Sequence, residues 1–403
     1  MATVLCVWEL GTDLGHLSTL RLPVEIALAQ GHRVVMALKE GHNVRQVFGE
    51  WPIQYLRAPF RQHSSAGALA PIPSFTHLLI RQCFDNREEL AGYLRAWRDI
   101  FDSVQPDIVL FEHSPTALIA AYGYEFKKIL VGNGFTAPPG HHGAGEPFLP
   151  FPTTTPGPDV LLGLLQDDAE VLKLINSARM QLQLSELPSM HAIYGQAHDC
   201  FLMTWPALDA FGLRLDAPYL GIEPPQSHTP PQWPSGGGPR VFGYLHAFPS
   251  VLALLRDLRS CQVRAVLFIR HLALELQEAF QGSGLEFVNR PVDLDRVACE
   301  ADWVINHGNH STAAHFASRG VSQLLIPLHQ EHLFLARNLQ RCGAAVIGYQ
   351  DQENFVGLLG ALSQDMRYRQ NAASLAQQCD QNHTRDARSY IARSFRLLTE
   401  TSI

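Results

Sequence analysis

The chain has 403 residues, of which 46% are hydrophobic and 17% charged, and its formal net charge is -7. This length exceeds one ordinary core, so we expect a globular protein of two domains. The negative balance without a long basic run argues against a nucleic-acid groove. No apolar stretch approaches the roughly 20 residues that span a bilayer. Seven scattered cysteines without a Cys-x-x-Cys pair favour reduced thiols in a cytoplasmic protein.

Short apolar runs alternate with helical patterns throughout the first half of the chain. The patterns predict strands over 3–8, 33–38, 107–111, 128–131 and 200–204, and helices over 17–30, 87–104, 114–123 and 160–184. Strand and helix in regular alternation indicate a parallel sheet, and hence a doubly wound, Rossmann-like α/β domain.

A Pro- and Gly-rich segment, EPPQSHTPPQWPSGGGP, separates this half from a second alternating half. Strands are predicted there over 240–245, 263–269, 285–288, 303–306, 323–326 and 345–347, with helices between them and from 353 onwards. We therefore expect domains over 1–222 and 240–383, a linker over 223–239 and a closing helical segment over 384–403. Two Rossmann-like domains facing across a cleft would present ligand sites at their strand carboxyl ends.

The most informative stretch is Asn306-His307-Gly308-Asn309-His310-Ser311-Thr312. It joins the predicted strand 303–306 to a predicted helix over 312–318. A small polar turn before a helix can hold an anion, because the first-turn N–H groups are free and the helix dipole favours negative charge. The turn therefore predicts a phosphorylated ligand.

The same stretch resembles the C-terminal domain of GT-B nucleotide-sugar glycosyltransferases of the UDP-glucuronosyl/macrolide/sterol type. That family shows His-Gly-Gly-x-Gly-Thr-x-x-Glu, then Gly-Val-Pro, then Pro-x-x-x-Asp-Gln. This chain has His307-Gly308-Asn309-His310-Ser311-Thr312-Ala313-Ala314-His315, then Gly320-Val321-Ser322, then Pro327 and Glu331-His332. Order and spacing match, although several identities differ. Gly15-His16, Gly31-His32-Arg33-Val34 and Pro106-Asp107-Ile108-Val109-Leu110 are similar to segments of the family's first domain.

The resemblance implies a donor site for a nucleoside-diphosphate sugar, with UDP or dTDP as the carrier. The diphosphate would meet the 307–312 turn, through Ser311 and Thr312 above all, with support from His307. Glu331 and His332 stand where the family has Asp and Gln near the donor sugar. His315 replaces the acid that commonly binds the ribose, so one imidazole stands in for a pair of acceptor oxygens. Val292 lies in the segment that usually holds the base.

The general base that we predict is His16, which follows the first strand in a polar turn. An imidazole titrates near working pH, as a proton acceptor should, and it needs an orienting carboxylate. Glu112 ends the strand over 107–111, where the family often has Asp, and Asp13 is the fallback. Attack opposite the diphosphate would invert the anomeric centre. No metal or cofactor beyond the nucleotide sugar is expected, and His141-His142 lacks a third ligand.

Simpler interpretations stand beside each of these assignments. His16 could be a solvated loop histidine, Glu112 a helix cap, His307 a satisfied buried histidine and Glu331 a solvated acid, while Ser311 and Thr312 suit an ordinary N-cap. A nucleotide-sugar epimerase and a non-catalytic nucleotide-sugar-binding protein are the alternative functions. The acceptor is expected to be a small molecule, met by a pocket around Phe60, Phe75, Phe84, Phe135 and Phe148. A homodimer stays open.

Overall fold

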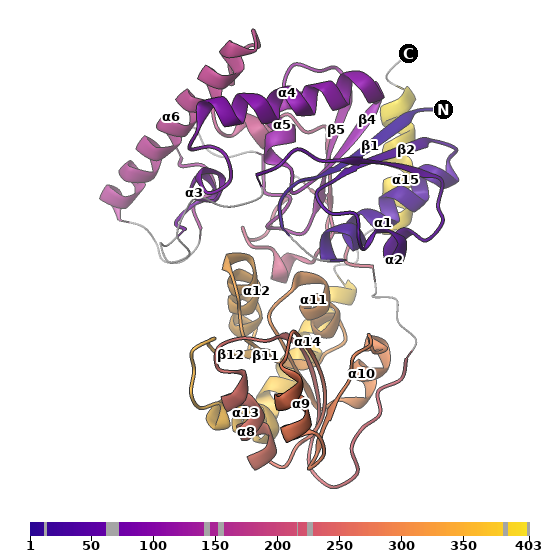
Figure 1. Ribbon diagram of the computed structural model, residues 1–403, viewed down its shortest axis with the longest axis vertical. Helices are drawn as coiled ribbons and strands as arrows, with labels where there is room; N and C mark the ends of the chain where they lie inside the picture. The colour runs from indigo at the N-terminus through magenta and orange to yellow at the C-terminus, as the bar shows by residue number, and fades with distance from the viewer. Residues whose placement is uncertain are drawn as a thin grey trace. The chain divides into compact units, whose positions relative to one another are not determined.

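The computed structural model covers the whole chain and describes residues 1–11, 14–61, 72–140, 146–151, 157–215, 217–223, 229–381 and 386–400 (Figure 1). The chain divides into two compact units. The first consists of Met1–Met203, Leu213–Leu220 and Arg385–Ile403, and the second of Thr204–Gly212 and Gly221–Thr384. The second unit thus takes in Thr204–Gly212, which falls inside the range expected for the first domain.

The first unit is built on a six-stranded parallel sheet in the order β3-β2-β1-β4-β5-β6. Its strands are β1 (Thr3–Trp8), β2 (Arg33–Leu38), β3 (Ile53–Arg57), β4 (Ile108–Glu112), β5 (Lys127–Gly132) and β6 (Asp199–Leu202). The central strands read as continuous apolar runs because helices cover both faces of the sheet. β1 pairs with β4 so that Trp8 stands beside Glu112 at the carboxyl edge.

Eight helices of the described residues belong to the first unit. They are α1 (Leu14–Ala29), α2 (Val44–Phe48), α3 (Phe75–Ile80), α4 (Arg87–Val104), α5 (Pro115–Ala121), α6 (Pro158–Gln181), α7 (Ala192–Gly195) and α15 (Ala387–Glu400). The closing helix α15 lies beside α1 (Figure 1), and Arg388 pairs with Glu25 at 2.9 Å. Phe395 is fully buried in the core of this unit. The chain therefore returns to its first unit after the second.

The second unit repeats this plan with the sheet order β12-β11-β10-β7-β8-β9. Its strands are β7 (Arg240–His246), β8 (Arg264–Arg270), β9 (Leu285–Phe287), β10 (Trp303–Asn306), β11 (Ser322–Leu325) and β12 (Ala345–Ile347). Its helices are α8 (Val251–Ser260), α9 (Leu274–Phe280), α10 (Leu294–Glu300), α11 (His310–Ser318), α12 (Gln330–Arg341), α13 (Val356–Gln364) and α14 (Met366–Gln381), with a 3-10 turn at Pro206–Leu208. Counted from its own first strand, each sheet has the order 3-2-1-4-5-6 of doubly wound folds.

The elements depart from the sequence-based prediction in three ways. α1 begins at Leu14, ahead of the predicted start at 17, and β3, α2, α3 and α7 were not predicted. Part of the predicted linker packs on the second unit, where the Trp233 indole donates to Glu300 at 2.7 Å. Residues 224–228 of that linker lie outside the described residues. Within the parts of the chain that are described, no helix is both long and apolar enough to cross a bilayer.

Candidate active site

In the first unit, the structure brings His16 and Glu112 together. Glu112 is the last residue of β4 and is 1% exposed, and His16 lies in the first turn of α1. The Nδ1 atom of His16 is 2.9 Å from both carboxylate oxygens of Glu112. A carboxylate can only accept, so Nδ1 carries the proton and Nε2 is the basic nitrogen of the ring. The tautomer is assigned from these partners.

Two other rings and a glycine lie close to the ring of His16. It stacks with Trp8, at a centroid distance of 5.2 Å, and with His113, at 5.9 Å and nearly parallel. Gly11 adopts a φ of +83°, and a Cβ built on it would fall 2.0 Å from Nε2 of His16. Only glycine can adopt this positive φ without strain and also leave room for the imidazole of His16.

Sequence reasoning missed Trp8 and His113. His113 has a φ of 39°, which is uncommon for a residue other than glycine and tends to occur near functional sites. This backbone conformation places the His113 ring against the ring of His16. No pattern in the sequence predicts that contact. The fallback carboxylate, Asp13, lies outside the described residues.

Of the five phenylalanines expected to line an acceptor pocket, Phe75, Phe135 and Phe148 pack in one cluster. Phe60 lies under the cations of Lys39 and Arg57, and Phe84 is buried. Phe75 is fully buried and touches the rings of Phe135, Phe148, Phe151 and Tyr194 at centroid distances of 5.7 to 6.4 Å. It also meets the His113 ring edge-on at 6.3 Å. This aromatic cluster therefore packs against His113, which stacks with His16. Residues 62–71 and 141–145, including His141-His142, lie outside the described residues.

In the second unit, a buried polar pair supports the turn between β10 and α11. Asn306 Nδ2 donates to Gln323 Oε1 at 2.8 Å, and Gln323 Nε2 donates to the Ala313 carbonyl at 2.8 Å. Asn306 Oδ1 accepts from the Gly308 N–H at 2.8 Å. Gly308 has a φ of +87°, and a Cβ there would meet the His332 carbonyl at 2.9 Å. The turn is thus fixed in shape before any ligand arrives.

The first turn of α11 offers donors to an anion. Asn309 is the N-cap, and its side chain makes no capping hydrogen bond. The hydroxyls of Ser311 and Thr312 have no hydrogen-bond partner among the described residues, and the first-turn N–H groups lack helical acceptors. His310 instead turns inward and bonds to the Thr204 hydroxyl at 2.8 Å. Burial lowers the pKa of His310 to about 4, so it is neutral near pH 7.

His307 is engaged with the main chain and not directed at a ligand. It is fully buried, its Nδ1 donates to the Ile326 carbonyl at 2.7 Å, and its Nε2 accepts from the His246 N–H at 2.8 Å. Burial lowers its pKa, which favours the neutral ring. A neutral His307 has no N–H left for a phosphate, so the predicted direct phosphate contact is corrected: the residue joins the ends of β7, β10 and β11.

Two more predicted ligands are buried. His315 is 2% exposed, and its Nε2 lies 3.7 Å from Asp295 Oδ1 on α10. Val292 packs with Phe316 and Val297 in a hydrophobic cluster. Neither side chain is exposed to a nucleotide, because both are buried. The predicted ribose contact of His315 and the predicted base contact of Val292 therefore do not follow from this geometry. Pro291, which precedes Val292, is exposed.

Glu331 and His332 lie in the first turn of α12. Glu331 is half-buried, whereas His332 is 4% exposed and lies against the ring of His329 at a centroid distance of 3.6 Å. Burial, followed by the neighbouring imidazoles His329, His307 and His246, lowers the pKa of His332 well below its ordinary value. Glu331 therefore remains the more accessible of the two for a donor sugar.

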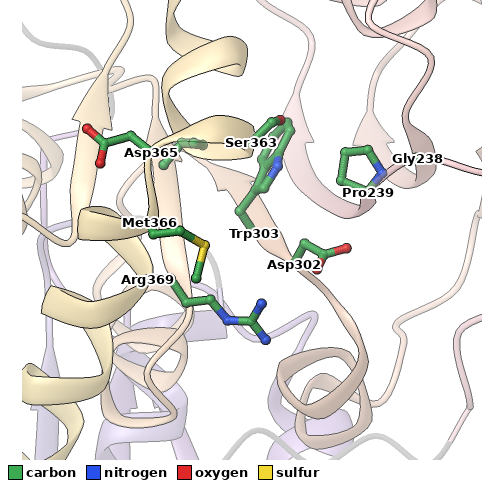
Figure 2. Close-up of a pocket in the computed structure, with 9 residues that line it drawn as sticks. Gly238, Pro239, Asp302, Trp303, Ser363, Asp365, Met366 and Arg369 are labelled. Carbon is green, nitrogen blue, oxygen red and sulfur yellow. The ribbon is translucent and has the colours of Figure 1, made fainter.

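A separate cavity of about 290 Å³ lies at the opposite edge of this sheet, where β7 and β10 begin (Figure 2). Met366 and Arg369 lie on one side of it and Pro239 and Asp302 on the other. None of the predicted donor residues lines it, so the strand carboxyl ends remain the candidate donor site. Across the described part of the chain, no group of three or more His, Cys, Asp or Glu residues is arranged to hold a metal ion. The predicted metal independence stays a prediction.

Neither a protein-family model nor a curated protein matches this chain. Solved structures do match it over its full length. The glycosyltransferase of kitacinnamycin aligns with a TM-score of 0.69 at 14% identity, covering 97% of this chain and 98% of its own. The rhamnosyltransferase SpnG, complexed with spinosyn aglycone, aligns with 0.64 at 15% identity, covering 99% and 100%. The glycosyltransferase VinC, complexed with dTDP, aligns with 0.61 at 14% identity, covering 97% and 100%. With its two six-stranded parallel sheets, the chain has the GT-B fold of these glycosyltransferases.

Proposed function

We propose that the chain is an inverting, metal-independent glycosyltransferase, which moves a sugar from a nucleoside-diphosphate sugar to a hydroxyl of a small acceptor. The observation that carries the proposal is the His16–Glu112 pair at the carboxyl edge of the first sheet. A base with an orienting carboxylate is what deprotonation of an alcohol needs. A ready-made anion turn on the second unit supplies the other requirement of the reaction.

In this mechanism Nε2 of His16 takes the proton of the acceptor hydroxyl. The oxygen forms a bond to the anomeric carbon as the bond from that carbon to the diphosphate breaks. The attack comes from the face opposite the leaving group, so the anomeric configuration inverts. Glu112 keeps Nδ1 protonated and stabilises the imidazolium, while the Trp8 and His113 rings hold its plane.

The leaving diphosphate would be held at the first turn of α11. Free N–H groups, the helix dipole and the hydroxyls of Ser311 and Thr312 favour the negative charge that develops as the glycosidic bond breaks. Glu331 would accept hydrogen bonds from donor-sugar hydroxyls. dTDP in VinC and the spinosyn aglycone in SpnG belong to those proteins; they support a nucleoside-diphosphate sugar, linked to UDP or dTDP, as the donor here and a small-molecule alcohol as the acceptor.

The test is incubation of the full chain with UDP- and dTDP-glucose and a panel of polyketide, flavonoid and macrolide alcohols, read by mass spectrometry. A new glycoside of inverted anomeric configuration by NMR supports the proposal. Retention of configuration, or turnover that survives His16→Ala, contradicts the mechanism. Added EDTA should leave the rate unchanged, and a rate that then needs Mg²⁺ contradicts metal independence.

Two other functions would give different results in the same tubes. An epimerase would interconvert the nucleotide sugar without any acceptor. A non-catalytic binding protein would be thermally stabilised by the nucleotide sugar and give no turnover. Because His315 and His332 are buried, the experiment also has to test for a non-catalytic binding protein.

A further inference from the structure

Histidine rings gather around the candidate diphosphate site on the second unit. His246 ends β7, and its ring centroid lies 6.0 Å from that of His271, after β8, and 6.0 Å from that of His307. The pair of His329 and His332 begins α12. The Gly308 turn approaches the His332 carbonyl. These five residues form what we term the imidazole cluster, and the ends of four strands, β7, β8, β10 and β11, contribute to it.

The members of the imidazole cluster divide into two kinds. His307 and His332 are buried, and burial lowers the pKa of each, so both stay neutral. His271 and His329 are exposed and His246 is half-buried, so a ligand and a proton can reach them. An imidazole ordinarily takes up a proton near pH ~6.5.

Other charges near the cluster are few. Residues 240–381 contain no lysine. Arg270 ends β8 and lies over the rings of Tyr244 and Phe268. Glu331, which precedes His332 in the first turn of α12, carries a carboxylate, and the lowered pKa of His310 keeps that ring neutral. Arg290, which is exposed, follows β9. Beyond Arg270 and Arg290, the side-chain cations that the described strand ends can offer a diphosphate are protonated histidines.

We propose that the donor diphosphate is bound by protonated imidazoles of His246, His271 and His329, so that donor binding takes up protons. This inference rests on the proposed function, because it concerns the same donor site. An ammonium or guanidinium is charged at every physiological pH, whereas an imidazole becomes charged only when a proton is available. A diphosphate beside a neutral imidazole raises its proton affinity.

The direction in which donor affinity changes with pH follows from this proton uptake. Protons bind more tightly to the complex than to the free protein, so donor affinity rises as the pH falls through the range in which the imidazoles titrate. Raising the proton affinity of one imidazole by one pKa unit gives at most about a tenfold change in donor affinity. Two responsive imidazoles would give a larger change.

The experiment is isothermal titration calorimetry of the full chain with UDP-glucose and with dTDP-glucose. The diphosphate diester of these probes does not titrate between pH 6 and 8, unlike free UDP, so any pH dependence belongs to the protein. We expect the Kd to fall about tenfold from pH 8 to pH 6. Titrations at pH 7 in buffers of different ionisation enthalpy should show net proton uptake on binding.

The variants are His246→Asn, His271→Asn and His329→Gln, singly and together, with His42→Gln as the control, since His42 is an exposed histidine of the first unit. The triple variant should bind with a nearly constant Kd across this range, and the control should behave as wild type. Thermal melts at each pH establish that the variants are folded.

Four results would overturn the inference. Wild-type binding without proton uptake would do so, and so would a triple variant that keeps the pH dependence of the wild type. If the Kd of each probe stays the same from pH 8 to pH 6, the imidazole assignment fails while the proposed function stands. If neither probe binds at any pH, the proposed function fails together with it.

Discussion

Nδ1 of His16 lies 2.9 Å from each carboxylate oxygen of Glu112, and Glu112 stands in register with Trp8 across β1 and β4. One pair of neighbouring strands thus supplies both the carboxylate that orients the imidazole and an aromatic ring that covers one face of it. Because both strands are buried in the centre of the sheet, neither group can shift without disturbing the core. This rigidity is what a base must have if it is to meet a hydroxyl in one geometry.

Removal of the base should abolish most of the transfer. We expect His16→Ala to lower kcat by about 10²- to 10⁴-fold, the usual contribution of a general base. Glu112→Gln should lower kcat less, because an amide oxygen still accepts from Nδ1–H but no longer stabilises the imidazolium. The measurement is steady-state kinetics with the acceptor found in the panel. Calorimetric binding of UDP-glucose is the control and should not change, since the predicted donor residues belong to the second unit.

Gly11→Ala should impair catalysis by displacing His16. A Cβ at position 11 would overlap the imidazole at Nε2, and the backbone there has a positive φ. Gly31→Ala is the matched control, because its φ of +78° imposes similar strain with no atom within 4 Å. Each substitution should cost about 1 kcal/mol of stability. Only the first should lower kcat, and equal kinetics for the two variants would show that Gly11 does not shape the base.

The ring of His113 should act as a positioning group for His16. His113→Ala removes the nearly parallel ring from one face of the imidazole, so we expect kcat to fall about ten- to a hundredfold with little change in KM. His113→Phe keeps a flat ring and should restore most of the rate. If His113→Phe is as slow as His113→Ala while both variants fold normally in thermal melts, the nitrogen atoms of His113 matter and not its stacking.

Buried neutral histidines should make the second unit sensitive to acid. His307, His310, His315 and His332 all have lowered pKa values, largely through burial. The unfolded chain then binds more protons below pH ~6.5, so their contribution to stability is complete above that pH and is lost as the pH falls towards the folded values, about 4 for His310.

The measurement is urea unfolding of wild type and His310→Asn at several pH values between 7.5 and 4.5. The unfolding free energy of the variant minus that of wild type should rise by about 1 to 3 kcal/mol as the pH falls. The comparison with wild type is needed because burial raises the pKa of Glu9 to about 7, which has the opposite sign in the same range. A difference that is constant with pH would refute the prediction.

The sequence predicts most of the two sheets because their central strands are continuous apolar runs. It did not predict β3, where Ile53 and Leu56 are the only less exposed positions on a largely solvated edge strand. α2, α3 and α7 have between four and six residues, too few for a helical period to be read. Chain order and the resemblance pointed to His16 and Glu112, which the fold places in contact. Their catalytic role stays a prediction.

The parts of the site that the sequence could not supply depend on which strands are neighbours. The imidazole cluster unites residues from the ends of β7, β8, β10 and β11, and no spacing along the chain links them. The same holds for His307, whose two ring nitrogens are occupied by main-chain groups 61 and 19 residues away. A resemblance transfers residue types to positions, but burial decides whether the side chain can reach a ligand.

The shared strand order of the two sheets has a consequence for where chemistry can arise. In each sheet the first and fourth strands are neighbours, β1 with β4 and β7 with β10, and their following loops leave in opposite directions. His16 and Glu112 lie at the carboxyl end of this pair in one unit, and His246 and His307 lie there in the other. The predicted proton acceptor and the proposed anion site would therefore be two uses of one topological position, distinguished only by the side chains that occupy it.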